Sequence, residues 1–161
     1  MRIGLISDTH DATDQVSRAL NLMQGRVDML VHTGDITKVE TVSLFEGWKT
    51  AFVWGNMDRD RAALLQSIKR TPGPFHFGAS FLIELDHLDI GFCHGDKADL
   101  MEELSMYCDI VCHGHIHQFR DEQSKDGTRI ICPGAVGGGG NSPRSCAILD
   151  TDDGTLQLIT L

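Results

Sequence analysis

The first 70 residues alternate between short apolar runs and segments in which apolar residues recur every three or four positions. Residues 2–7, 28–32 and 50–54 are short aliphatic runs of the kind that forms buried strands. The segments after them have the apolar spacing of amphipathic helices, carried by Val16, Ala19, Leu20 and Met23, by Val39, Val42 and Phe45, and by Ala62, Leu65 and Ile68. Three successive strand–loop–helix units predict a parallel sheet with right-handed crossover connections.

The pattern changes at residues 71–74, where Thr-Pro-Gly-Pro breaks the helical spacing. Paired strands are predicted beyond this break, in hairpins over residues 81–93, 119–132 and 145–161. Leu100, Leu104 and Tyr107 indicate a helix ahead of a buried strand at residues 109–112. We therefore expect a two-sheet α/β sandwich, parallel in its first part and largely antiparallel later, that folds as a single domain over residues 1–161.

Composition narrows the class of protein. Of 161 residues, 41% are hydrophobic and 23% are charged, which are ordinary shares for one soluble globular domain. No apolar run approaches the roughly 20 residues of a membrane-spanning helix, and the first residues lack the pattern of a signal peptide. Five cysteines without a Cys-x-x-Cys pair fit buried thiols in a reducing compartment, so we expect a cytoplasmic protein.

The charge of the chain argues against some partners. A formal net charge of −9 disfavours a broad nucleic-acid surface or an anionic-membrane surface, because such surfaces are basic. A small anionic substrate remains compatible with this charge, since a bound metal ion would dominate the local field. Exposed strand edges could pair between subunits, so a homo-oligomer is also compatible with the sequence.

The segment Cys-His-Gly-His-Ile-His-Gln at residues 112–118 carries the densest chemistry of the chain. It places three imidazoles within five residues, directly after a predicted buried strand. In an extended segment, residues two apart project to the same side, so His115 and His117 can reach one small site. Neutral imidazole is the commonest protein ligand for zinc, iron, manganese or nickel, although any one of these histidines could be an ordinary strand-end residue.

Residues able to bind metal follow five of the predicted strands. They are Asp8, His10, Asp35, Asn56, His94, His115 and His117. Open α/β sheets place their ligand crevice outside the carboxyl ends of the strands, so these side chains can converge. Taken singly, Asp8 and Asp35 could cap helices and Asn56 could be a turn residue. Taken together, the seven indicate a metal site.

The series Asp-x-His, Gly-Asp, Gly-Asn, His and Gly-His-x-His resembles the motifs of the calcineurin-like metallophosphoesterases. The resemblance covers nearly the whole chain, and the length matches their small bacterial and archaeal phosphodiesterase branch. It implies two divalent metal ions, with Mn²⁺ as first choice and Fe, Ni or Zn as alternatives. One ion would be held by Asp8, His10 and His117 and the other by Asn56, His94 and His115, with Asp35 as the bridge between them.

Two such cations about 3.5–4 Å apart can hold a phosphoryl group and activate a bridging water. We therefore expect hydrolysis of small phosphate esters, above all phosphodiesters, by a hydroxide that bridges the metals. Asp35, Asn56 and His94 would take part in catalysis, and Asn56 and Arg144 would contact the substrate. Arg144 resembles the Pro-Arg of the family, and a solvated loop arginine is the open alternative.

Departures from the family pattern leave other readings open. Met57 stands where many members have a histidine that serves the leaving group, and a thioether cannot donate a proton. Asp58 matches an acidic residue of the family motif that orients its neighbours. His113 could support the metal ligands. The remaining histidines match no motif position and are expected at the surface or in hydrogen bonds; they are His32, His76 and His87. The rival functions are a non-catalytic assembly scaffold, like the retromer subunit of this fold, and a metal-dependent amide hydrolase.

Overall fold

The computed structural model describes residues 1–72, 77–85, 87–139 and 141–161. Residues 73 and 74 of the predicted break, His76, residue 86 in the turn before the strand at 88–93, and residue 140 in the glycine-rich loop at 133–144 lie outside these ranges. The described elements, in chain order, are β1 (Arg2–Ile6), α1 (Thr13–Met23), β2 (Met29–His32), α2 (Val39–Ser43), β3 (Thr50–Val53), α3 (Arg61–Ile68), β4 (Phe77–Gly78), β5 (Ser80–Leu85), β6 (Leu88–Cys93), α4 (Ala98–Tyr107), β7 (Ile110–Cys112), β8 (Phe119–Gln123), β9 (Arg129–Pro133), β10 (Ser145–Asp150) and β11 (Leu156–Thr160).

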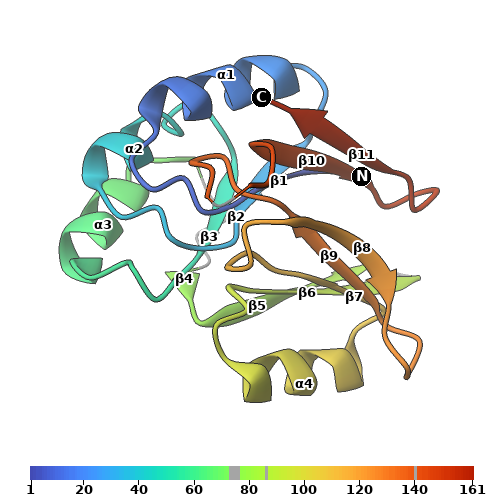
Figure 1. Ribbon diagram of the computed structural model, residues 1–161. Coiled ribbons are helices and arrows are strands. Elements are labelled where there is room, and N and C mark those ends of the chain that lie inside the picture. Colours follow the sequence, from blue (N-terminus) through green and yellow to red (C-terminus); the bar gives the residue numbers. More distant parts are fainter. Residues whose placement is uncertain (73–76, 86, 140) are drawn as a thin grey trace.

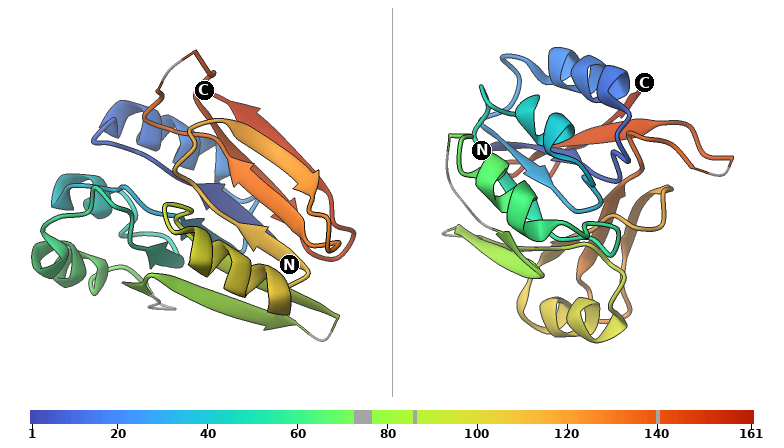
Figure 2. Two further views of the ribbon diagram at one scale, coloured as in Figure 1. Left: turned by 60° about the horizontal axis from the view of Figure 1, so that its bottom comes forward. Right: turned by 90° about the vertical axis from the view of Figure 1, so that its left-hand side faces the viewer.

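Two sheets face each other, with helices on their outer faces (Figure 1). In the described part, the first sheet has the strand order β11-β10-β1-β2-β3-β4 and the second the order β5-β6-β7-β9-β8. Helices α1, α2 and α3 cover the first sheet, and α4 lies against the outer face of the second (Figures 1 and 2). The expected two-sheet α/β sandwich is confirmed, and β1, β2 and β3 are parallel as their crossover helices require.

The second half of the chain is largely antiparallel, as expected, and has two features that were not predicted from the sequence. The last hairpin joins the first sheet, because β10 pairs antiparallel with β1. The second sheet has a parallel centre, in which β7 is parallel to both β6 and β9, and only its outer pairs β5–β6 and β8–β9 are antiparallel. The physical reason is α4, which crosses over between β6 and β7 and so returns the chain in the same direction.

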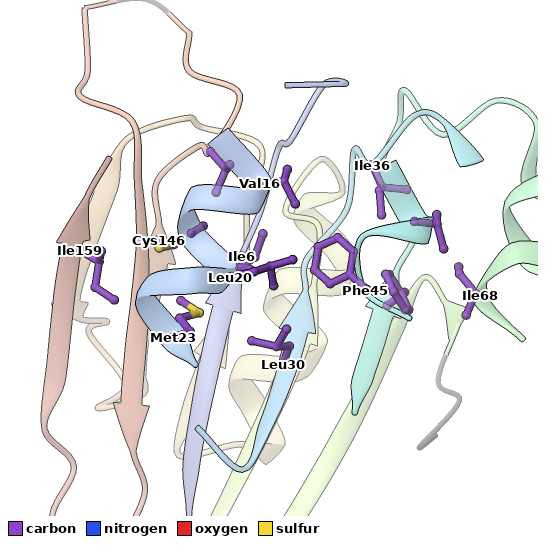
Figure 3. Close-up of a cluster of buried hydrophobic side chains, with 14 of the residues drawn as sticks. Ile6, Val16, Leu20, Met23, Leu30, Ile36, Phe45, Ile68, Cys146 and Ile159 are labelled. Atoms are coloured by element: carbon purple, nitrogen blue, oxygen red, sulfur yellow. The ribbon is translucent and has the colours of Figure 1, made fainter. Parts of the chain in front are cut away.

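The first sheet separates two of the three clusters of buried hydrophobic residues in the described part, and the third lies between the second sheet and α4. Ile6, Leu20, Leu30 and Phe45 belong to the cluster packed between this sheet and its helices (Figure 3). Ile3 and Leu5 of β1 point the other way, into the cluster between the two sheets. This is the alternation expected of a strand buried on both faces. All five cysteines are buried free thiols, and among the described residues no helix is long and apolar enough to cross a membrane.

Candidate metal centre

The seven candidate ligands follow the carboxyl ends of five strands. Asp8 and His10 follow β1, Asp35 follows β2, Asn56 follows β3, His94 follows β6, and His115 and His117 follow β7. Three adjacent strands of the first sheet, β1, β2 and β3, and two strands of the second therefore place all seven at one end of the sandwich. Hydrogen bonds join the loops directly: Asp8 N–H donates to the carbonyl of Gly34, and His10 N–H donates to the carbonyl of Asp35.

The first ligand group consists of Asp8, His10 and His117. Nε2 of His117 lies 3.2 Å from Oδ1 of Asp8 and 3.2 Å from Nε2 of His10. Nε2 of His10 lies 3.9 Å from the same carboxylate oxygen. These three atoms meet the spacing of a shared metal ion. Asp8 is fully buried, whereas the two imidazoles are partly open to solvent, which leaves an entry for a ligand.

The second ligand group centres on His94. Its Nε2 lies 3.0 Å from Oδ1 of Asn56 and 3.5 Å from Oδ2 of Asp35. Oδ2 of Asp35 also lies 3.8 Å from Nε2 of His10, which belongs to the first group. One carboxylate oxygen thus stands between imidazoles of both groups. Asp8 is also close enough to share an ion with Asp35 and His94, so both carboxylates lie near the middle of the centre.

The donor set fits divalent cations. Oδ1 of Asp8 is buried and accepts no hydrogen bond from any described residue. A buried carboxylate oxygen without a donor carries a desolvation cost that a cation would offset. The two nitrogens of His10 and His117, only 3.2 Å apart, also need a proton or a cation between them. Mixed nitrogen and oxygen donors without thiolate suit manganese, iron, nickel or zinc.

The backbone is strained at the ligands. Among the described residues, positive φ angles occur at seven non-glycine positions, namely Asp8, His10, Asp11, Asp35, Thr37, His115 and His117. Five of these seven are candidate ligands. A left-handed backbone costs an L-residue with a side chain on the order of 1 kcal/mol or more. The chain bears this cost five times in one place, which is typical of a functional site and not of a solvated surface.

Gly114 is needed for the loops after β1 and β7 to approach each other. A Cβ atom at this position would lie 1.9 Å from Oγ of Ser7 and 2.6 Å from Oδ2 of Asp8. With no side chain there, Oδ2 of Asp8 accepts hydrogen bonds from the hydroxyl of Ser7 and, at 2.9 Å, from the N–H of His115. Oδ1 of Asp8 is thereby turned toward His117.

The tautomer of His94 is set by its surroundings. Its Nδ1 lies 2.8 Å from the carbonyl of Thr33, which can only accept, so Nδ1 carries the proton and Nε2 faces Asn56 and Asp35. Burial disfavours the charged ring, but the hydrogen bonds to Asp35 and Thr33 outweigh it and raise the pKa of His94 to about 9. Burial likewise opposes ionisation of Asp35, yet hydrogen bonds from His94 and from Met57 N–H lower the pKa of this carboxyl group. A metal ion would replace the proton on His94.

Asp58 ties the loop after β2 to the loop after β3. Its Oδ2 accepts hydrogen bonds from the N–H groups of Asp35 (3.1 Å) and Gly55 (2.8 Å), and its Oδ1 accepts one from Thr37 N–H (2.8 Å). Burial raises the pKa of this carboxyl group, with the nearby Asp35 charge adding to the effect. The structure therefore gives a basis for the orienting role expected from the motif, because Asp58 holds the backbone of Asp35.

His32 is buried and links two ligand loops, a role that the sequence does not reveal. Its Nδ1 accepts a hydrogen bond from Gly34 N–H (3.2 Å), and its Nε2 lies 3.1 Å from the hydroxyl of Thr9. In the chain, Thr9 stands between the candidate ligands Asp8 and His10. Burial lowers the pKa of His32 to about 3, so the ring is neutral. Of the two alternatives expected for it, a surface position is wrong and a role in hydrogen bonds is confirmed.

Other candidates lie around this centre. The ring of His115 is exposed and 5.1 Å from the ring of His94, and His115 is in neither of the two close ligand groups. Arg144 is exposed, and its side chain lies beside Gly138. His113 is buried, and its Nδ1 donates to the carbonyl of Gly114. The side chain of Met57 is 40% exposed at the rim.

Comparison with known proteins agrees with this geometry. Residues 1–154 match the family model of the calcineurin-like phosphoesterase superfamily domain. The chain is 27% identical to Phosphodiesterase MJ0936 of Methanocaldococcus jannaschii over 100% of its own length and 99% of that protein. It is 30% identical to Probable metallophosphoesterase MJ0623 of the same organism over 73% of this chain and 59% of that protein.

Solved structures extend the comparison. A structure described as a novel archaeal phosphodiesterase superposes with a TM-score of 0.90 at 26% identity, with both chains covered completely. Vps29 from Chaetomium thermophilum shares the fold, with a TM-score of 0.73 at 17% identity over 100% of this chain and 96% of that chain. The candidate ligands at the strand ends and the two-sheet fold agree with the match over residues 1–154, which shows that the chain belongs to the calcineurin-like phosphoesterase superfamily.

Proposed function

We propose that this chain is a phosphodiesterase that uses two divalent metal ions, with Mn²⁺ as the first choice. The observation that carries the proposal is the position of Asp35, whose Oδ2 lies 3.8 Å from Nε2 of His10 and 3.5 Å from Nε2 of His94. A single carboxylate between imidazoles of two ligand groups is the arrangement that a two-metal hydrolase requires. The name of the relative from M. jannaschii supports a phosphodiester as the substrate.

Bound in these two groups, the cations would supply positive charge for the phosphoryl oxygens and a hydroxide between them as the nucleophile. The protein's part is to hold the ligands before substrate arrives. Asp58 fixes the backbone of Asp35, and the carbonyl of Thr33 fixes the ring of His94. The amide of Asn56, which lies beside His94, can contact both a metal and a phosphoryl oxygen.

The leaving group receives no proton from residue 57 in this proposal. Met57 contributes its backbone N–H to Oδ1 of Asp35 at 2.8 Å, and its side chain is a thioether. The side chain can therefore shield the rim of the centre but cannot act as a general acid. Esters with acidic alcohols, which leave as stable anions, should be the best substrates.

The experiment is an assay of metal-free and Mn²⁺-loaded protein with bis(4-nitrophenyl) phosphate, 4-nitrophenyl phosphate and a 4-nitroanilide. We expect turnover only with metal, and faster turnover of the diester than of the monoester. Preferred cleavage of the anilide would favour an amide hydrolase. Metal binding without turnover of any of the three would favour a scaffold that keeps the fold alone, and activity in protein shown to be metal-free would exclude the two-metal mechanism.

A further inference from the structure

A pocket of about 220 Å³ lies beside the metal-binding loops, where edge strands of the two sheets meet. It opens between the start of β8 and the end of β11, since both supply lining residues. Phe119 of β8, Pro143 of the glycine-rich loop and Leu158 of β11 form its apolar walls. We call it the Phe119 pocket.

Leu158 points toward the space between the sheets but is not covered there. Alternate residues of β11 share a face, so Leu156 and Leu158 point the same way. Leu156 packs against the core between the sheets, while Ile159, on the opposite face, packs under the helices. Leu158 nevertheless remains 43% exposed. An apolar side chain left open on an inward face forms a wall that a ligand can cover.

The described lining of the Phe119 pocket contains no charged side chain. Its polar members are Gln118, Ser142, Ser145 and Thr160, and the hydroxyl of Ser145 already donates to the carbonyl of Pro133 at 2.8 Å. The charges farther along β8 are paired, as Arg120 contacts Glu122 and Asp121 contacts Arg129. A charged ligand group would lose water here without gaining a charged partner from the described lining, so an uncharged occupant fits the lining better.

Two of the segments that line the pocket also reach the candidate metal ligand His117. Gln118 directly follows His117 in the chain. The glycine-rich loop that supplies Ser142 and Pro143 packs on the same imidazole, because a Cβ at Gly139 would lie 2.2 Å from Nδ1 of His117. A phosphoryl group held at His117 would therefore carry one of its ester groups toward the Phe119 pocket.

We propose that the Phe119 pocket binds an uncharged aromatic ester group of the substrate, which makes aryl-type phosphodiesters the preferred class. The proposal rests on the two-metal phosphodiesterase function above. A ring suits the pocket because Phe119 and Pro143 offer flat apolar faces and Gln118, Ser142 and Thr160 offer hydrogen bonds to its edge. This is a specificity site, since it selects the organic part of a substrate while the metal ligands grip the phosphoryl group.

The test compares phenyl phosphate with methyl phosphate, which share the phosphoryl group and differ only in the ring. Binding to the Mn²⁺-loaded protein is measured by calorimetric titration. We expect the phenyl ester to bind about tenfold more tightly or better, as burial of a ring predicts. Leu158→Ser and Phe119→Ala should reduce this ratio toward one and leave the affinity for methyl phosphate unchanged.

Leu82→Ser is the matched control, because Leu82 is 44% exposed on β5, at the opposite edge of the second sheet. It should leave the ratio as in the wild type. A wild-type ratio near one, failure to bind either ester, or a ratio unchanged in both pocket variants would overturn the proposal. Diester hydrolysis, assayed in the same preparations, separates the two proposals: a preserved phenyl preference without turnover refutes the phosphodiesterase function alone, and turnover without the preference refutes the pocket alone.

Discussion

The carboxylate of Asp58 accepts a hydrogen bond of 3.1 Å from the backbone N–H of Asp35, the residue that stands between the two ligand groups. We expect Asp58→Asn to lower metal affinity by about 10–100-fold, the usual effect of losing an outer partner of a ligand. The amide can replace only one of the two acceptor oxygens, so the free energy of unfolding of the metal-free protein should fall by about 1–3 kcal/mol. Metal titration and denaturant unfolding measure the two effects.

Asp14→Asn is the control for Asp58→Asn. Asp14 is exposed in the first turn of α1, and the same change of charge there should alter neither metal affinity nor stability by a measurable amount. Equal losses in both variants would mean that net charge, and not the hold on Asp35, sets the affinity.

Asp35→Asn should remove metal from both ligand groups. If the remaining oxygen of the variant keeps the hydrogen bond from Met57 N–H, its amide NH₂ faces His10 and His94; in the opposite orientation, a neutral oxygen faces them. Without the shared negative charge we expect turnover to fall on the order of 10³-fold or more. The measurement is manganese stoichiometry after equilibrium dialysis, together with turnover of bis(4-nitrophenyl) phosphate.

Asp11→Asn provides the comparison for Asp35→Asn. Asp11 also has a positive φ, but its carboxylate contacts Thr37 and Lys38 and none of the candidate ligands. It should keep both metal ions. Two bound ions and wild-type turnover in Asp35→Asn would show that the bridging assignment is wrong.

His32 should make the protein sensitive to acid. Its pKa is lowered from 6.5 to about 3, so below pH 6.5 the unfolded chain takes up a proton that the folded chain does not. Stability from this residue is therefore present above pH 6.5 and is lost as the pH falls, by about 2 kcal/mol at pH 5. We expect metal-free His32→Asn to lose less stability than the wild type between pH 7.5 and pH 5.

Urea unfolding at both pH values measures this difference, and the contribution of His94 largely cancels because both proteins carry it. At pH 7.5 the variant should be less stable, since the ring of His32 also packs against Phe45 and Phe52. Identical pH dependence of the two proteins would show that His32 takes up a proton in the folded state.

Met57→His should assist poor leaving groups. A positioned general acid contributes about 10²–10⁴-fold, and its benefit grows as the departing alcohol becomes more basic. A plot of log turnover against leaving-group pKa should therefore be flatter for Met57→His than for the wild type, at matched manganese content. Met57→Leu is the control, because it keeps the apolar bulk and should keep the wild-type slope. A steep line for both variants would show that residue 57 does not face the departing oxygen.

The local spacing of apolar residues predicted much of the fold. The three strand–helix units at the start were predictable because each buried face repeats with its own period, as in Ile3 and Leu5 against Val16 and Leu20. The partner of β10 was not, since the run Ser145–Asp150 indicates a buried strand without saying which strand lies beside it. The parallel centre of the second sheet was missed although α4, between β6 and β7, carried its signal.

The candidate site could likewise be predicted from the sequence only in part. Spacing along the chain brings out Asp8, Asp35 and His94, because each follows a predicted strand. The buried place of His32 depends on contacts with Thr9 and Gly34, which no pattern of neighbouring residues encodes. That Asp8, Asp35, His94 and His115 bind metal, and that Arg144 contacts the substrate, stays a prediction.

During synthesis, β1 can complete its strand pairing only after the last hairpin has been made. Arg2 pairs with Asp150, so β1 stays without a neighbour on one side until the residues of β10 have left the ribosome. Until then Ile3 and Leu5 lack part of the layer that later buries them. Pairing over so many residues slows folding and prolongs the exposure of apolar surface. We therefore expect nascent chains that stall before β10 to aggregate or to bind chaperones.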